Sequence, residues 1–265
     1  MEISKHIPGS FCWGELGTTD QVSAKKFYAG LFGWEIKDVP MGPESSYTIL
    51  QIKGKDLGAI YQLGKEQLDQ GIPPHWLSYV AVESADAAAK AITAAGGSLM
   101  MEPFDVYDIG RMTVAKDPTG ATFAIWQPLK HIGAQVKNEN NTMCWNELAT
   151  RDLKAAKNFY GKVFGWNFVT KEDEPVTYTE IYLGDPKERN AVGGMLTMTK
   201  EWGEAPPYWN IYFAVSDCNA IVNRAKTLGA NIHVPPTDIP NVGRFALLQD
   251  QQGAFFSVIN LIHLS

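Results

Sequence analysis

The sequence is poor in cysteine, in positive charge and in long apolar runs. Three cysteines among 265 residues cannot build a disulfide framework. Lysine and arginine number 23 against 29 acidic residues, and a net charge of -6 disfavours a nucleic-acid partner. No apolar run reaches 18 residues, and the first residues lack the apolar stretch of a signal peptide. These absences predict a cytoplasmic protein that binds neither nucleic acid nor a membrane.

Motifs of several enzyme classes are also missing. No glycine-rich phosphate loop follows a strand and opens a helix, and no nucleophile elbow occurs. The five histidines are scattered along the sequence, and we expect only His75 to lie near a binding site. We therefore expect no nucleotide cofactor and no histidine-based metal centre.

A tandem repeat organises the chain. Cys-Trp-Gly-Glu-Leu at residues 12–16 returns as Cys-Trp-Asn-Glu-Leu at 144–148, and Phe-Tyr and Phe-Gly-Trp follow at equal spacing in both copies. Every element of the motif recurs 132 positions later, for example Cys12 and Cys144. The repeat predicts two domains, residues 8–128 and 142–262, joined by a polar linker at 129–141.

Each half contains the same order of elements twice. A strand at 11–17 precedes a helix that Thr19 or Asp20 caps and Gly33 ends, and three further strands follow. After an expected loop at 64–74, a strand at 76–82, a helix at 85–95 and three strands repeat the pattern. The sequence thus predicts an α+β fold with four βαβββ units, whose curved mixed sheets surround two cavities.

Alternation along the strands predicts which side chains face these cavities. In the strand at 209–215 every second residue is apolar, so that face is expected to pack on the helices. The opposite face carries Asn210 and Tyr212. The same logic buries Leu16 and Leu148 under the helices and turns the tryptophan and glutamate of each repeat motif toward the cavities.

Glu15 and Glu147 are the catalytic candidates. A carboxylate on the inner face of a central strand is partly desolvated, which raises its pKa and suits a general base or an anchor for a ligand hydroxyl or amine. The alternative is a structural carboxylate that pairs with Arg111 or Arg244, or one that bridges the two halves.

Aromatic and amide side chains on the same faces are the ligand-binding candidates. They are Trp13, Tyr47, Tyr79, Trp126, Trp145, Tyr178, Asn210 and Tyr212. The alternative for the rings is that they fill the interior while their hydroxyls reach a partner. Because Asn210 replaces Leu77 and Ile259 replaces Trp126, the two cavities are expected to differ, and one of them could be filled.

These residues carry a family resemblance. The opening strand, the Asp-capped helix ending in Phe-Tyr, the Phe-Gly-Trp motif and the Asp117–Gly120 turn resemble the glyoxalase/bleomycin-resistance/dioxygenase (vicinal oxygen chelate) superfamily, in particular its two-domain glyoxalase-like subgroup. The resemblance covers nearly all of residues 10–128 and 142–261. It implies a tandem pair of glyoxalase/bleomycin-resistance domains and a small organic ligand.

The metal ligands that the resemblance implies are absent from this sequence. The family's first histidine position is Trp13 in one half and Trp145 in the other, and its second is Leu77 or Asn210. Its final glutamate position is Ala124 or Ser257, and no carboxylate occurs at 57–63 or 191–199. Indole and aliphatic groups do not coordinate divalent metals, so we expect no metal and no ordinary glyoxalase or dioxygenase chemistry.

Three functions remain open at this point. The first is a metal-independent enzyme, a lyase, isomerase or hydroxylase-like protein, in which Glu15 or Glu147 is the base. The second is a protein that sequesters a flat aromatic drug or metabolite, as bleomycin-resistance members of the superfamily do, and the third is a degenerate structural module. The tandem chain can complete its cavities internally, so we expect a monomer or a weak homodimer, while closure of the sheets within or between halves stays open.

Overall fold

The computed structural model describes the chain except residues 1, 43–44, 172–176, 189 and 264–265. The first half begins with β1 (Phe11–Thr18), α1 (Gln21–Phe32), β2 (Glu35–Pro40), β3 (Ser46–Ile52) and β4 (Lys55–Gln62). After the short helix α2 (Lys65–Asp69) it continues with β5 (His75–Ala81), α3 (Ala85–Ala94), β6 (Ser98–Leu99), β7 (Phe104–Val106), β8 (Gly110–Lys116) and β9 (Thr122–Pro128).

The second half repeats this order. Its first unit is β10 (Met143–Thr150), α4 (Leu153–Phe164), β11 (Asn167–Lys171), β12 (Tyr178–Tyr182) and β13 (Ala191–Thr197), with the 3-10 turns η1 (Pro186–Glu188) and η2 (Lys200–Trp202). Its second unit is β14 (Tyr208–Ala214), α5 (Cys218–Thr227), β15 (Asn231–Ile239), β16 (Gly243–Gln249) and β17 (Phe255–Leu261). The α+β tandem architecture is confirmed.

Each half builds its own mixed sheet. The strand order is β2-β3-β4-β1-β5-β9-β8-β6 in the first half, with β7 on β8, and β11-β12-β13-β10-β14-β17-β16-β15 in the second. β1 and β10 therefore lie at the centre, each parallel to one neighbour and antiparallel to the other. Each sheet contains strands of one half only, so strands pair within each half and not between the halves.

The predicted helix ends are confirmed. Asp20 and Asp152 each cap a helix by accepting a hydrogen bond from the backbone N–H three residues later. Gly33 and Gly165 end these helices in the left-handed conformation, with φ of 73° and 68°. Two predictions are wrong in detail, because the expected loop at 64–74 contains α2 and the strand expected after α3 is split into β6 and β7.

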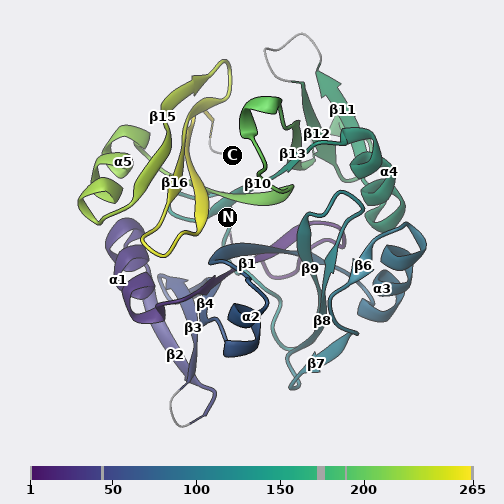
Figure 1. Cartoon of the computed structure of the whole chain (residues 1–265), viewed down its shortest axis with the longest axis horizontal. Coiled ribbons are helices and arrows are strands. Elements are labelled where there is room, and N and C mark those ends of the chain that lie inside the picture. Colours follow the sequence, from purple (N-terminus) through teal and green to yellow (C-terminus); the bar gives the residue numbers. More distant parts are fainter. Residues whose placement is uncertain (1, 43–44, 172–176, 189, 264–265) are drawn as a thin grey trace.

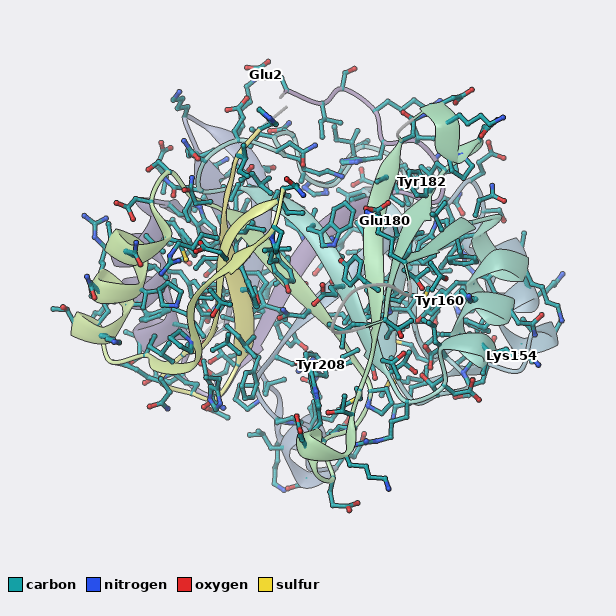
Figure 2. The ribbon with its side chains drawn as sticks, turned by 90° about the horizontal axis from the view of Figure 1, so that it is seen from above. Glu2, Lys154, Tyr160, Glu180, Tyr182 and Tyr208 are labelled. Atoms are coloured by element: carbon teal, nitrogen blue, oxygen red, sulfur yellow. The ribbon has the colours of Figure 1, made fainter. Side chains whose placement is uncertain are left out.

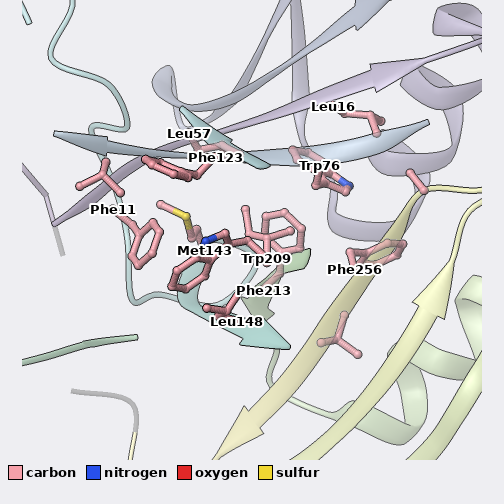
Figure 3. Close-up of a cluster of buried hydrophobic side chains, with 14 of the residues drawn as sticks. Phe11, Leu16, Leu57, Trp76, Phe123, Met143, Leu148, Trp209, Phe213 and Phe256 are labelled. Carbon is pink, nitrogen blue, oxygen red and sulfur yellow. The ribbon is translucent and has the colours of Figure 1, made fainter. Parts of the chain in front are cut away.

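The helices bring the two halves together. Figure 1 shows α1 of the first half beside α5 of the second at one side, and α3 beside α4 at the other. One apolar core lies between the sheets and includes Phe11, Trp76, Phe123, Trp209 and Phe213 from both halves (Figure 3). The face of each strand that alternation assigned to the helices is therefore buried against the helices and against the other half.

Hydrogen bonds cross this core in matched pairs. Trp34 donates its indole N–H to the Asn141 carbonyl, and Trp166 donates in the same way to Gly9, at 2.7 and 2.8 Å. Because each contact has its counterpart 132 residues along the chain, the halves are related by an approximate two-fold arrangement. Among the residues described, no helix is long and apolar enough to cross a membrane.

Candidate functional site

The face of each sheet that points away from the shared core carries the recurring glutamate of the repeat, and we name it the glutamate face. Glu15 lies between Ala59 of β4 and Leu77 of β5 in the strand register. Glu147 lies in the same way between Gly194 of β13 and Asn210 of β14. Both glutamates thus stand on central strands, where backbone pairing on both sides fixes the position of the side chain.

In the first half, two tyrosine hydroxyls hold Glu15. Tyr47 donates to Oε1 at 2.5 Å and Tyr79 donates to Oε2 at 2.6 Å. Burial raises the pKa of Glu15 above its ordinary value, although both hydrogen bonds act in the opposite direction. Burial is therefore the cause of the raised pKa, as expected from the sequence. Each carboxylate oxygen accepts a hydrogen bond from one phenol.

The second half repeats the arrangement around Glu147. Tyr212 donates to Glu147 Oε1 at 2.7 Å, and Tyr178 is a second hydrogen-bond partner of the carboxylate. Trp145 donates its indole N–H to the Tyr178 hydroxyl at 2.9 Å. Burial again raises the pKa of Glu147. A Cβ at position 194 would overlap the Tyr178 hydroxyl, so Gly194 is what lets this phenol reach across the strand.

The alternative that these glutamates pair with arginine is wrong. Arg111 binds Asp86 and Asp105, each at 2.9 Å. Arg244 binds Asp238 at 2.7 Å. Both arginines lie at hairpin ends near solvent, so phenols and not cations meet the hydrogen-bonding demand of the two carboxylates.

Asn210 distinguishes the second glutamate face from the first, which has Leu77 at the same position. Its side chain is 5% exposed and lies beside Glu147, opposite it in the antiparallel register. The amide nitrogen donates to Ser257 Oγ at 2.7 Å, while Oδ1 has no hydrogen-bond partner. A buried polar atom without a partner is unfavourable by about 1–3 kcal/mol, so this oxygen is prepared to accept a hydrogen bond.

Trp126 and its counterpart Ile259 close the far end of the two faces. The Trp126 indole donates to the His131 carbonyl at 2.8 Å, and the ring packs in the small apolar cluster over the first glutamate face. Ile259 is buried in the second half. All the predicted site residues therefore lie on one of the two glutamate faces, five on the first and five on the second, and none lies in the shared core.

Four further side chains on these faces were missed from sequence. Tyr61 and Tyr208 lie near Glu15 and Glu147, and burial followed by repulsion from these carboxylates raises the pKa of each phenol to about 12. Glu180 stands opposite Gly194 and accepts from the Tyr182 hydroxyl at 2.5 Å (Figure 2). Alternation would have found Tyr208 and Glu180, which lie two residues from Asn210 and Tyr178.

The side chains do not offer a metal site. In the described part of the chain, no three His, Cys, Asp or Glu side chains gather closely enough to hold a metal ion. In the second half the positions that the resemblance assigns to ligands hold Trp145, Asn210 and Ser257, of which the indole has no lone pair to donate. The described residues therefore lack the cluster of histidine and carboxylate donors that the resemblance implies for a divalent metal.

Two surface hollows lie away from both glutamates. One, of about 290 Å³, is lined by residues around Val215 and Asn260, and the other, of about 210 Å³, lies between Lys26 and Leu228. Neither is lined by Glu15 or Glu147. The ligand cavity expected over the glutamate faces therefore stays a prediction.

Comparison with known families gives two matches along the chain. The model of the Glyoxalase/Bleomycin resistance protein/Dioxygenase superfamily matches residues 13–125 and again 129–258. The protein named "Putative glyoxylase CFP32" of Mycobacterium tuberculosis is 40% identical over 97% of this chain and 96% of its own length. "Anthracycline biosynthesis protein DnrV" of Streptomyces peucetius is 35% identical over 98% of this chain and 96% of its own length.

Solved structures share the fold at low sequence identity. The Mn(II)-bound glyoxalase from Novosphingobium aromaticivorans superposes with a TM-score of 0.65 at 15% identity, covering 97% of this chain and 83% of that one. The 2,3-dioxygenase LapB from Pseudomonas sp. KL28 gives 0.64 at 10% identity, with coverage of 96% and 93%. At these identities the likeness concerns the arrangement of strands and helices.

Proposed function

This chain belongs to the Glyoxalase/Bleomycin resistance protein/Dioxygenase superfamily, and we propose that it binds a planar aromatic small molecule on a glutamate face without a metal ion. The observation that carries this proposal is the partly buried glutamate held by two tyrosine hydroxyls beside a tryptophan, built twice on a central strand. A purely structural face would gain more from apolar side chains than from a carboxylate withdrawn from water.

The chemistry of the face suits a flat ligand with polar substituents. Indole and phenol rings offer large rigid surfaces that contact another ring edge-on or face-on. The carboxylate and phenol oxygens keep acceptor lone pairs at fixed positions, and these orient a hydroxyl or N–H group of the ligand. The name of one relative, an anthracycline biosynthesis protein, supports a fused aromatic ring system as the ligand class.

A second candidate function is proton transfer within the same complex. Burial raises the pKa of Glu147 above its ordinary value, which suits a general base that removes a proton next to a carbonyl group. The hydroxyls of Tyr212 and Tyr178 would then stabilise the carboxylate form and release it as the proton arrives. This chemistry would make the protein a metal-independent isomerase or lyase, and the binding step is common to both candidates.

Dihydroxyanthraquinone, a flat ring system with phenolic and carbonyl oxygens, tests the binding proposal. We expect it to raise the melting temperature and to quench tryptophan fluorescence. The double variant Glu15→Gln, Glu147→Gln should weaken binding at least about tenfold, because a hydrogen bond to a charged group contributes about 1.5–3 kcal/mol. The matched control is Glu66→Gln, Glu201→Gln, which makes the same change at two exposed positions.

Two results would contradict the proposal. One is the absence of any melting shift or quenching across hydroxylated anthraquinones and naphthoquinones, and the other is equal affinity in both double variants. The catalytic candidate is tested separately by NMR in deuterated water with a hydroxylated 1-tetralone, which carries exchangeable C–H protons on the carbon next to its carbonyl. Proton exchange that is faster with the unaltered protein than with the glutamine variant supports catalysis. Equal exchange rates indicate that the protein binds the compound without catalysis.

A further inference from the structure

The two glutamate faces share their central residues but differ around them. Glu, Trp and two Tyr recur on both, whereas the register places Asn210 where the first half has Leu77. Ser257 likewise stands opposite Tyr212 where Ala124 stands opposite Tyr79. The second face is therefore more polar at its centre, although both faces arise from the same repeat.

A segment of the connector covers the first face, and we name residues 129–136 the strap. The Ala134 N–H donates to the Cys12 carbonyl at 2.7 Å, and the Gln135 N–H donates to the Asp56 carbonyl at 2.7 Å. His6 contacts the Ala134 carbonyl through Nε2 at 2.8 Å. Ala134 is fully buried in the cluster that contains Trp13, so the strap is part of the packed structure.

Gly133 permits this close approach. It has a φ of +97°, and a Cβ there would lie 2.5 Å from the Cys12 carbonyl oxygen. Cys12 lies where the register of β1 and β5 shifts between Phe11 and Trp13, and its carbonyl turns to the strap. An irregular position in the strand and a glycine in the connector together bring the strap onto the sheet.

The strap places an aromatic ring on the tryptophan of the first face. The His131 ring stands edge-on to Trp13, with the centroids 4.9 Å apart and the planes at 90°. Its backbone carbonyl accepts the Trp126 indole N–H, and His131 Nε2 lies 3.5 Å from Asp56 Oδ2. The first face thus already holds a flat ring against its tryptophan, and the His131 Nε2 atom is buried there without a hydrogen-bond partner.

No segment within the described residues crosses the second face in this way. Cys144 and Trp145 are partly exposed, whereas their counterparts Cys12 and Trp13 are buried. Asn210 Oδ1, at the position that Leu77 holds on the covered face, is buried without a hydrogen-bond partner. In the described part of the second half, no aromatic ring stands against Trp145 as His131 stands against Trp13, and Asn210 Oδ1 is an acceptor without a partner.

We infer that the strap is a built-in occupant of the first glutamate face, and that the second face alone takes the external ligand. This inference rests on the proposed function and specifies it. The ligand ring takes the position against Trp145 that His131 takes against Trp13, and a ligand O–H or N–H donates to Asn210 Oδ1. The ligand class is a planar aromatic compound with a phenolic hydroxyl or ring N–H.

Hydrogen–deuterium exchange of the full chain with dihydroxyanthraquinone tests the inference without any substitution. We expect one molecule bound per chain by native mass spectrometry. Slower exchange is expected in peptides that cover 143–150 and 208–214, with no change at 11–18 and 75–81. Two bound molecules, or protection in the first half, would overturn the assignment to the second face while leaving the binding proposal intact.

A pair of mirrored variants adds a second measurement. Asn210→Leu gives the second face the residue of the first and removes the free acceptor, so affinity for the probe should fall about tenfold or more. Leu77→Asn makes the reverse change under the strap and should alter affinity less than about twofold. Equal effects of the two changes contradict the inference. If the unaltered protein does not bind the probe, both the inference and the proposed function are wrong.

Discussion

The Tyr160 hydroxyl donates a hydrogen bond to Asp117 Oδ2 over 2.9 Å and thereby joins the helix of one half to the last turn of the other. The same hydroxyl accepts the Trp209 indole N–H at 2.8 Å. Tyr28 repeats the contact with Asp250 at 3.0 Å. The turn predicted from Asp-Pro-Thr-Gly therefore has a second role, since its aspartate also fastens the two halves together.

Tyr160→Phe should destabilise the protein by about 1–3 kcal/mol. The change leaves the Trp209 indole N–H and Asp117 Oδ2 buried without this partner, and an unsatisfied buried group carries its full desolvation penalty. Urea unfolding measures the loss in free energy of unfolding. Tyr107→Phe is the matched control, because that tyrosine is 72% exposed. Equal midpoints for the two variants would show that the contact contributes nothing.

Glu147→Gln should alter how stability depends on pH. The pKa of Glu147 is raised in the folded state above its ordinary value of 4.5, so between these two values the folded chain binds more protons than the unfolded one. Stability of the unaltered protein therefore falls as pH rises from about 4.5 through the folded-state pKa, by about 1.4 kcal/mol per pH unit between the two pKa values. Glutamine does not titrate and removes this fall.

The measurement is the difference in free energy of unfolding between the variant and the unaltered protein from pH 4 to pH 8. The difference should grow in favour of glutamine as pH rises and then become constant. Glu66→Gln, at an exposed position, should show no such trend. A difference that is flat across the whole range would mean that burial does not perturb Glu147.

Divalent metals should leave the protein unchanged. The side chains at the positions that the resemblance assigns to ligands include indole and aliphatic groups, which do not coordinate them. A metal at a hundred times its Kd would add about 2.7 kcal/mol of stability, which calorimetry detects readily. We expect equal melting temperatures with EDTA and with added Mn²⁺, Fe²⁺ or Zn²⁺. The Mn(II)-bound glyoxalase from Novosphingobium aromaticivorans, assayed in parallel, is the positive control.

Gly133→Ala should destabilise the chain more than the same change at Gly71. Both glycines have positive φ, 97° and 73°, but a Cβ at Gly133 meets the Cys12 carbonyl whereas one at Gly71 meets nothing within 4 Å. Backbone strain alone costs about 1–2 kcal/mol at each position, and the clash adds to it only at Gly133. Thermal and urea unfolding of the two variants give the comparison. A smaller loss at Gly133 would mean that the strap is loosely held.

Much of the fold follows from the printed sequence because the repeat and the strand alternation are local signals. The caps Asp20 and Gly33 and the face of Glu15 depend on neighbours within a few residues, so they follow from the pattern. The sequence offers both tyrosines and an arginine as hydrogen-bond partners of Glu15, and it does not decide between them. Only the register of β3 and β5 brings Tyr47 and Tyr79 to the carboxylate.

Other features carry no local signal. The strap mixes aliphatic and polar residues with a glycine, so the sequence predicts only a linker there, and its packing on Cys12 involves the irregular register of β1. The Tyr28–Asp250 contact joins residues 222 positions apart and belongs to neither half alone. Glu180 is different, because alternation from Tyr178 places it on the glutamate face, although its counterpart in the first half is the apolar Ile49.

The strap also has a consequence for symmetry. Two separate copies of one half could associate with both glutamate faces alike, but a continuous chain has only one connector between its two halves. That connector leaves β9 and enters β10, and on its way Ala134 and Gln135 donate hydrogen bonds to the first sheet. Among the described residues, the connector therefore makes the two faces unequal. The difference between Leu77 and Asn210 thus comes in addition to the difference in what covers the two faces.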